Sequence, residues 1–134
     1  MADSVLLPLQ DALGYVFRDE TLLLTALTHS SYSNENKSAS ENNERIEFLG
    51  DAVLGLTISH LLFCRFPNAS EGVLSLYRQY LVCEATLARI AQKLSLGRYL
   101  RLGRGEERQG GREKRSILAD ATEALFAAVF FGCR

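Results

Sequence analysis

Apolar residues recur along this chain at helical spacing, and no stretch shows the sustained alternation of a β-strand. Leu23 and Leu27, for example, fall one turn apart on the same face of a helix. The longest such pattern runs from Asn43 to about Phe66, where Pro67 ends it. The pattern therefore predicts an all-α fold.

Cap and turn residues divide the pattern into six predicted helices. Asp19 and Ser70 are expected N-caps, and Gly14 is expected to stop the first helix. The predicted helices cover residues 8–13, 20–28, 43–66, 71 up to Cys83, Cys83 to 97, and 113–131. Between the second and third helices, the polar and small residues 29–42 predict a mobile loop. His29 at its start could be a metal ligand, but a lone histidine at a helix end is more often a hydrogen-bonding strut, and we predict the strut.

Three acidic residues lie on one narrow face of the longest predicted helix. Glu44, Glu47 and Asp51 are spaced i, i+3 and i+7, and no Lys or Arg stands one turn away on that face. The flanking residues are almost all apolar, so we expect the helix to be largely enclosed. Because buried carboxylates need a cation or a proton, a divalent metal bound through oxygen is favoured. The alternative, a solvated acidic stripe, usually carries interspersed lysines.

Asp120 and Glu123 repeat this arrangement in the last predicted helix. They are spaced i, i+3 in a segment that is otherwise apolar or small. No histidine lies near them in sequence, which disfavours a di-iron centre, and all-oxygen ligation favours Mg²⁺ or Mn²⁺. Glu71 could be a further metal-site carboxylate or could complement its own helix dipole, and its position favours neither.

Gly50 and Gly55 lie inside the longest helix, where each costs roughly 1 kcal/mol relative to alanine. Two such costs in one helix indicate that another backbone, or a twin subunit, approaches closely there.

Composition and net charge limit the kinds of binding partner to expect, but they do not identify one. The 134 residues suffice for one domain, and a net charge of -1 implies no polyanionic partner. The three cysteines are widely spaced without a CxxC pair, so zinc and a disulfide framework are not expected. No apolar run approaches membrane-spanning length. We expect a cytoplasmic protein with no membrane partner and no small-molecule cofactor.

Basic residues concentrate between Arg98 and Arg115 and are interrupted by glycines. A charge run is usually a solvated face, but Gly110-Gly111-Arg112 directly before a helix can also cradle a phosphate. We assign RNA binding to Arg108, Arg112 and Lys114 within this run.

Several separated segments resemble the catalytic domain of the ribonuclease III family, the double-stranded-RNA endonucleases that include Dicer and Drosha. These segments are Leu27–Tyr32, Asn43–Leu54, Glu71–Ser75 with Arg78, and Gly110–Arg112 through Ser116–Asp120 to Glu123-Ala124. The resemblance covers essentially the whole chain in the right order and is closest to the bacterial type.

The resemblance implies the ribonuclease III endonuclease-domain helical fold and a homodimer whose shared valley holds an RNA duplex. It implies cleavage that depends on Mg²⁺, for which Mn²⁺ can substitute, with 5′-phosphate and short 3′-overhang products, in the processing of rRNA and mRNA precursors. By motif match it assigns metal ligation to Glu47, Asp51, Asp120 and Glu123, catalysis to Asp51 and Glu123, substrate positioning to Glu44 and Glu71, and insertion into a socket on the twin subunit to Phe48.

We expect residues 1–134 to be this catalytic domain alone. Family members usually continue into one more helix and a separate double-stranded-RNA-binding domain, whereas this sequence ends at Arg134. The alternative is a catalytically impaired RNA-binding or dimerisation module built on the same fold. The retained Asp51 and Glu123 argue against it, because such a module has no reason to keep unpaired acids.

Overall fold

The computed structural model describes residues 4–37 and 41–132. Within them the chain forms eight α-helices, two short 3₁₀-helices and no β-strand, which confirms the predicted all-α fold. The helices are α1 Leu7–Leu13, α2 Glu20–Ala26, α3 Ser30–Glu35, α4 Glu44–Arg65, α5 Glu71–Val82, α6 Glu84–Lys93, η1 Leu96–Tyr99, α7 Arg104–Arg108, η2 Gly111–Glu113 and α8 Arg115–Gly132.

The ends of several helices follow from the predicted local residues. Gly14 ends α1 in the left-handed conformation, with φ 64°. The Asp19 carboxylate accepts a hydrogen bond from the backbone N–H of Thr21 at 3.0 Å and caps α2. The Ser70 hydroxyl oxygen accepts the N–H of Val73 at 3.3 Å and caps α5. These caps satisfy helix-end groups that would otherwise lack partners.

Two short helices, α3 and α7, were not predicted. Residues 29–42 were expected to form a loop, but His29 Nδ1 accepts the N–H of Ser31 at 3.1 Å and begins α3. The Glu35 carboxylate then accepts the N–H groups of Arg104 at 2.8 Å and Gly105 at 3.3 Å, which begins α7. The predicted hydrogen-bonding role of His29 is confirmed. The cap from Glu35 joins two segments that are distant in sequence, and the spacing of apolar residues does not predict such a contact. Residues 38–40 of the predicted loop lie outside the described residues.

The helices around η1 and η2 also differ slightly from the prediction. The helix predicted to reach residue 97 ends at Lys93, because Ser95 adopts a left-handed φ of 52° and the chain continues as η1. The last helix begins at Arg115 rather than at Glu113, which belongs to η2.

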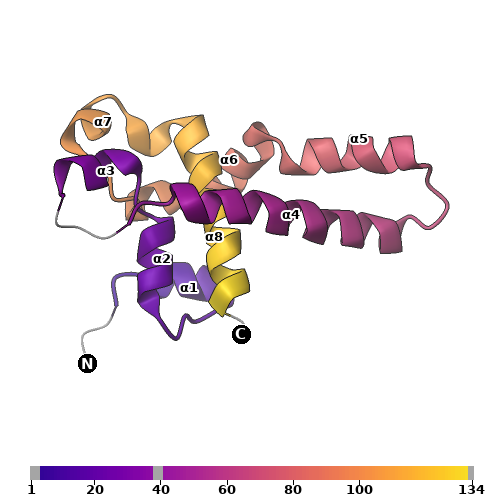
Figure 1. The fold of residues 1–134 in the computed structure, drawn as a ribbon, viewed down its shortest axis with the longest axis horizontal. Coiled ribbons are helices and arrows are strands. Elements are labelled where there is room, and N and C mark those ends of the chain that lie inside the picture. The colour runs from indigo at the N-terminus through magenta and orange to yellow at the C-terminus, as the bar shows by residue number, and fades with distance from the viewer. Residues whose placement is uncertain (1–3, 38–40, 133–134) are drawn as a thin grey trace.

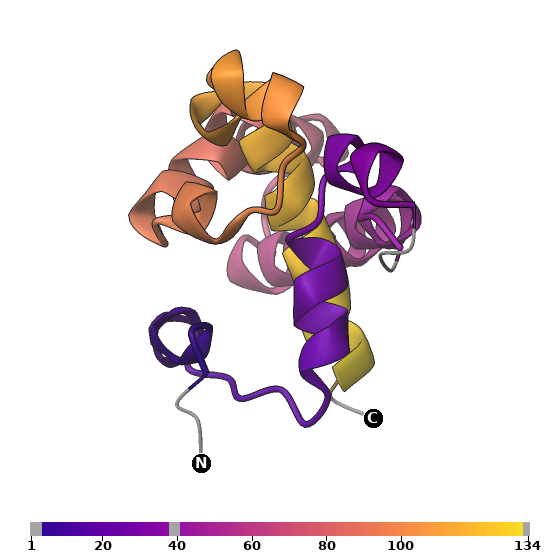
Figure 2. The same ribbon diagram turned by 90° about the vertical axis from the view of Figure 1, so that its left-hand side faces the viewer.

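The central element of the molecule is α8, which packs against α4, α6 and α2 (Figures 1 and 2). Most of its apolar residues are small, so neighbouring helices can approach its backbone closely. Its buried residues are Ile117, Leu118, Ala119, Ala121, Thr122, Ala124, Leu125, Ala127 and Ala128. This helix therefore carries much of the core that fixes the positions of the surrounding elements.

In contrast, α4 is exposed along most of its length, which corrects the expectation that it would be enclosed. Figure 1 shows α4 and α5 as a hairpin that extends away from the other helices. The side chains of Phe48, Leu56 and Phe63 are 83%, 74% and 70% exposed. The apolar residues of α4 thus form a surface of this chain rather than its core.

A second correction concerns the length of this apolar helix. By length and composition α4 is the one described helix that could cross a membrane, whereas we expected no such stretch. The acidic residues of α4 lie near its N-terminal end, so the rest of the helix is long and apolar. The Gly, Ser and Thr residues between the apolar ones interrupt the apolar run in the sequence, which is why its full length was not predicted.

Candidate metal centre

The candidate site lies where α4 crosses α8. A Cβ atom at Gly50 would overlap the backbone carbonyl oxygen of Glu123, so the two helices touch through their main chains. This contact confirms the predicted close approach at Gly50, and the approaching backbone is α8 of the same chain. Gly55 differs, because a Cβ there would meet no atom within 4 Å in this chain. A twin subunit at Gly55 stays a prediction.

The crossing brings acidic residues of the two helices together. Glu47 precedes Gly50 by about one turn and shares a hydrogen bond with Asp120 of α8. Burial, followed by the charges of Asp120 and Glu44, raises the pKa of Glu47 to about 7. A hydrogen bond between two carboxyl groups requires a proton on one of them. In the absence of a cation, protons therefore relieve part of the repulsion at the site.

The same electrostatic environment surrounds Glu123. Burial, followed by the charges of Asp51 and Glu47, raises the pKa of Glu123 to about 7. For Asp120, burial and the Glu84 carboxylate raise the pKa, while His29 and the hydrogen bond from Glu47 oppose that shift. Charge interactions thus connect the two acids of α4, Glu47 and Asp51, with Glu123 of α8, and connect Glu47 and Glu123 with Asp120. The assignment of these four residues to a metal site stays a prediction.

The arrangement is an open cluster rather than an enclosed pocket. Glu47, Asp120 and Glu123 are partly buried, and Asp51 is exposed, which corrects the expectation of fully buried acids. In the described residues no three acidic, histidine or cysteine side chains already stand close enough to form a metal-binding group. The donor set is all oxygen, which suits Mg²⁺ or Mn²⁺.

Glu84 and His29 lie near the cluster without having been predicted as part of it. Glu84 begins α6 and forms an ion pair with Arg115 at 3.2 Å, yet its charge still acts on Asp120. Neither residue is close to Asp120 in sequence, and no periodic spacing relates them. Only the packing of α6 and of the turn after α2 against α8 reveals this proximity.

The two secondary acids are not equivalent in this chain. Glu44 is one turn before Glu47, and its charge raises the pKa of Glu47. Glu71 begins α5 at the opposite end of the α4–α5 hairpin from the acidic cluster (Figure 1), and its carboxylate accepts the Ser75 hydroxyl at 2.7 Å. This position matches the helix-dipole alternative within one chain. A role for either residue in positioning substrate stays a prediction.

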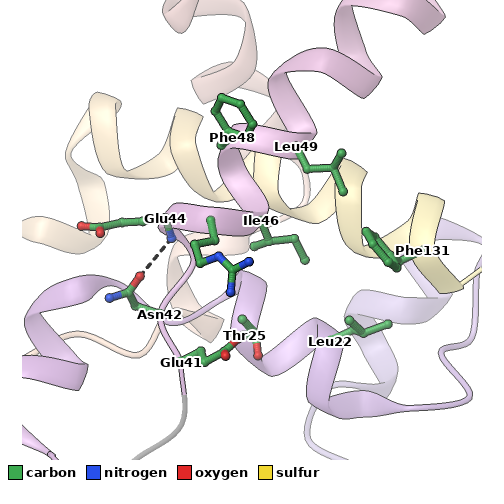
Figure 3. Close-up of a pocket in the computed structure, with 10 residues that line it drawn as sticks. Leu22, Thr25, Glu41, Asn42, Glu44, Ile46, Phe48, Leu49 and Phe131 are labelled. Atoms are coloured by element: carbon green, nitrogen blue, oxygen red, sulfur yellow. Dashed lines mark hydrogen bonds between the residues drawn. The ribbon is translucent and has the colours of Figure 1, made fainter.

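A hollow of about 660 Å³ lies beside the N-terminal half of α4 (Figure 3). Exposed Phe48 stands at this hollow, which α2, α4 and the end of α8 surround. The residues that line it are Leu22, Thr25, Glu41, Asn42, Glu44, Arg45, Ile46, Phe48, Leu49 and Phe131. It includes no member of the α4–α8 carboxylate cluster, and five of its ten lining residues are apolar.

The three basic residues assigned to RNA binding have different surroundings. Arg112 donates from Nη1 to the carbonyl oxygens of Gly97 at 2.8 Å and Leu100 at 2.6 Å, so its guanidinium joins η1 to η2. Lys114 forms an ion pair with Glu106 at 2.9 Å. Arg108, at the end of α7, is exposed. Their contact with RNA stays a prediction, and Arg112 has a structural role in addition.

A family model described as Ribonuclease-III-like matches residues 19–132 of this chain. The chain belongs to the ribonuclease III family. This membership agrees with the resemblance of its motifs and with the helical fold described above.

Curated relatives within the ribonuclease III family are more than half identical to this chain. It is 55% identical over 122 residues to Ribonuclease 3 of Caldanaerobacter subterraneus subsp. tengcongensis, a match that covers 91% of this chain and 54% of the relative. It is 57% identical over 122 residues to Ribonuclease 3 of Oleidesulfovibrio alaskensis, covering 91% of this chain and 53% of the relative. The chain thus spans about half the length of the curated relatives it matches.

Solved structures of ribonuclease III relatives share the fold. The nuclease domain of ribonuclease III from Campylobacter jejuni superposes with a TM-score of 0.88 at 45% identity, covering 95% of this chain and 85% of that one. Dicer from Pichia stipitis gives a TM-score of 0.62 at 27% identity, covering 87% of this chain and 46% of that one. The similarity therefore lies in the nuclease portion of the family.

Proposed function

We propose that this chain is the nuclease portion of an Mg²⁺-dependent endoribonuclease that hydrolyses double-stranded RNA. The observation that carries the proposal is the α4–α8 crossing, which gathers the four carboxylates of the family motifs. The products would carry 5′-phosphates and short 3′ overhangs. The natural substrates would be rRNA and mRNA precursors in the cytoplasm.

The acidic side chains would act by holding the metal and orienting it. Glu47, Asp51, Asp120 and Glu123 would be its ligands, with Asp51 and Glu123 closest to the chemistry, and Mn²⁺ could replace Mg²⁺. When bound, the ion supplies an activated water and offsets charge on the phosphate and the leaving oxygen. Burial and neighbouring charges raise the pKa of Glu47 and Glu123 to about 7, so metal binding near neutral pH would release protons from these carboxyl groups.

A second copy of the chain would complete the enzyme. The exposed apolar residues of α4 need a cover, and the Campylobacter jejuni nuclease domain has a region involved in dimer formation. In our proposal Phe48 of each subunit enters the hollow of the other, where Leu22 and Phe131 would receive its ring (Figure 3). The resulting interface would be isologous, as expected of a two-fold dimer.

Recognition of the duplex would rest on its shape and backbone. Double-stranded RNA offers phosphates and 2′-hydroxyl groups rather than readable base edges. Arg108 is exposed and takes no part in the backbone contacts that hold Arg112, so it is the better placed of the two for a phosphate.

The test is cleavage of long double-stranded RNA with Mg²⁺, comparing Glu123→Ala with the matched control Glu113→Ala, which removes an exposed acid of η2. Metal catalysis supplies several kcal/mol, so we expect Glu123→Ala to lose about 10³-fold in rate and the control to retain its rate. Undiminished cleavage by Glu123→Ala would overturn the proposal. RNA binding that persists in EDTA, with no nicking under any metal, would instead favour the binding-module alternative.

A further inference from the structure

Helix α7 begins at a backbone segment that two side chains of α3 hold in place. The Ser31 hydroxyl oxygen accepts the N–H of Gly103 at 2.9 Å. The two oxygens of the Glu35 carboxylate accept the N–H of Arg104 at 2.8 Å and the N–H of Gly105 at 3.3 Å. Figure 1 shows the two short helices side by side, in agreement with their contact. Three successive backbone donors at the start of α7 therefore bond to side chains that stand four residues apart on one face of α3.

The contact between α3 and α7 is close enough to require glycine. A Cβ atom at Gly103 would lie 2.6 Å from the carbonyl oxygen of Ser31 and 2.8 Å from Oε1 of Glu35. These distances are too short for a carbon atom, so any other residue would push the segment away from α3. Because α7 has only five residues, its own hydrogen bonds are too few to fix it. Its direction depends on its neighbours, of which Glu35 holds the first turn.

Helix α7 presents two arginine side chains that are open to an anion. Arg104 and Arg108 are four residues apart, and both are exposed. Among the residues that the structure describes, neither guanidinium group forms a hydrogen bond or an ion pair. The basic residues that follow are ion-paired instead: Arg112 with Glu107, Lys114 with Glu106 and Arg115 with Glu84. The positive charge of α7 is therefore free to meet phosphates.

The charge of Glu35 by itself opposes binding of RNA. Hydrogen bonds from Arg104 and Gly105 lower the pKa of this exposed carboxyl group, so it is ionised at neutral pH. A negative charge beside two arginines that face phosphates repels the polyanion. An acid in this place is thus expected to weaken RNA binding, unless its hydrogen bonds contribute more than its charge costs.

We propose that Glu35 is a positioning residue for the RNA duplex, because its carboxylate fixes the first turn of α7 and thereby the place where Arg108 meets a phosphate. Glu35 acts through the backbone of α7 and does not touch the RNA. The inference rests on the proposed function and adds to it a residue of α3, a helix to which no role in RNA binding was assigned.

Three single variants separate the charge of Glu35 from its hydrogen bonds. Glu35→Ala removes both, whereas Glu35→Gln removes the charge and keeps one acceptor oxygen for α7. Glu113→Ala is the matched control, because Glu113 is an exposed acid of the same basic stretch and, within the described chain, its side chain accepts no hydrogen bond. If charge alone matters, all three variants bind RNA more tightly or unchanged. The positioning role instead predicts weaker binding in Glu35→Ala.

Affinity for a labelled RNA duplex is measured by fluorescence anisotropy with Mg²⁺, in the Glu123→Ala background where the duplex is expected to stay uncut. We expect Glu35→Ala to raise the dissociation constant about 10-fold, the effect of one lost charge-assisted contact. Glu35→Gln should raise it by no more than about threefold, because its amide oxygen still accepts a backbone N–H. Glu113→Ala should bind no more weakly than its parent.

Cleavage kinetics with the native Glu123 separate positioning from a loss of stability. We expect Glu35→Ala to raise KM and to leave kcat at saturating RNA unchanged, because the α4–α8 carboxylate cluster is intact. A role in stability alone would lower the thermal midpoint and reduce kcat through the fraction of folded protein, without raising KM.

A double variant tests whether Glu35 acts through Arg108. Arg108→Ala should weaken binding and reduce the slope of log affinity against log salt concentration by roughly one. Glu35→Ala should reduce this slope in the same way. The double variant should bind within about twofold of Arg108→Ala alone, because the phosphate contact is already lost.

The outcomes distinguish this inference from the proposed function. If the native chain binds duplex RNA without cleaving it, the enzymatic function is overturned, and the affinities still decide the role of Glu35. If it neither binds nor cleaves the duplex, both are overturned. The positioning role alone is overturned if Glu35→Ala binds RNA as tightly as its parent or more tightly, or if the losses in Glu35→Ala and Arg108→Ala add in full.

Discussion

The helices α4 and α8 share a pattern of apolar and acidic residues but have different environments. Both are apolar helices that carry acidic residues at i, i+3 or i, i+4 spacing. In α8 most apolar side chains are buried within the chain, whereas α4 buries only Gly50, Leu54 and Leu62. The apolar residues of α8 therefore stabilise the fold of one chain, and those of α4 are available to a second copy. The acidic cluster lies on the line where the two helices meet.

This difference explains why the carboxylates are only partly buried. The small residues of α8 let α4 cross it at backbone contact, so the acids leave bulk water on one side. The open side leaves the cluster accessible to the proposed RNA substrate, which an enclosed pocket would exclude. Partial burial is nevertheless enough to raise the pKa of both Glu47 and Glu123.

The largest expected effect comes from Gly50→Ala, which places a methyl group on the Glu123 carbonyl. Since backbone cannot move aside cheaply, we expect a loss of about 3 kcal/mol or more in the free energy of unfolding, measured in urea. Gly55→Ala is the matched control in the same helix, where the added methyl meets no atom in this chain. In a single chain, without a second copy at Gly55, it should gain roughly 0.5–1 kcal/mol from helix propensity. Equal losses in both variants would contradict the backbone contact between α4 and α8.

A somewhat smaller effect is expected from Phe48→Ala on association. Phe48 is 83% exposed, so its loss should leave the unfolding of a single chain nearly unchanged. If it is the anchor of the proposed dimer, the dissociation constant should rise about 30-fold, the effect of a 2 kcal/mol hot spot. Sedimentation equilibrium measures this shift. The control is Val16→Ala, which truncates a 66% exposed residue near α1 and should leave the dimer intact. If neither change affects the dissociation constant, the dimer interface does not include Phe48.

The smallest effect we expect is the pH dependence of the metal-free protein, because solvent screens the partly exposed carboxyl groups that cause it. Folding raises the pKa of Glu47 and Glu123 from 4.5 to about 7. Between these values the folded state keeps protons that the unfolded state has released, so the free energy of unfolding falls as pH rises. Urea unfolding in EDTA should therefore show stability lost between about pH 5 and 7.

The double variant Glu47→Gln/Glu123→Gln is the control for this slope. It should reduce the slope, because two of the three carboxyl groups with a raised pKa are removed and only Asp120 remains. Asp19 and Glu35, whose pKa values are lowered by hydrogen bonds, stay ionised in this window and do not contribute to the slope. A slope unchanged in the double variant would assign the pH dependence to other groups.

Much of the local structure could be predicted from single residues. Gly14, Asp19 and Ser70 fixed helix ends because each acts on its own neighbours in sequence. The short helices α3 and α7 could not be predicted, since Glu35 caps α7 from a distant segment. Arg112 was assigned to RNA by its charge and its place after Gly110-Gly111, whereas its contacts with the carbonyls of Gly97 and Leu100 depend on tertiary packing.

The sequence by itself determined the helical class and the longest helices, because residue spacing is a property of local segments. It also predicted a metal site, for which the family motifs supplied the set of four acids. Only the tertiary structure decided that α4 is exposed while α8 is buried. Burial of apolar side chains is favourable whatever apolar surface covers them. Whether an apolar helix face packs within its own chain or stays open to a second chain therefore depends on where the helices cross. The packing of α6 and α2 against α8 brings Glu84 and His29 near Asp120, and no spacing along the chain encodes that proximity.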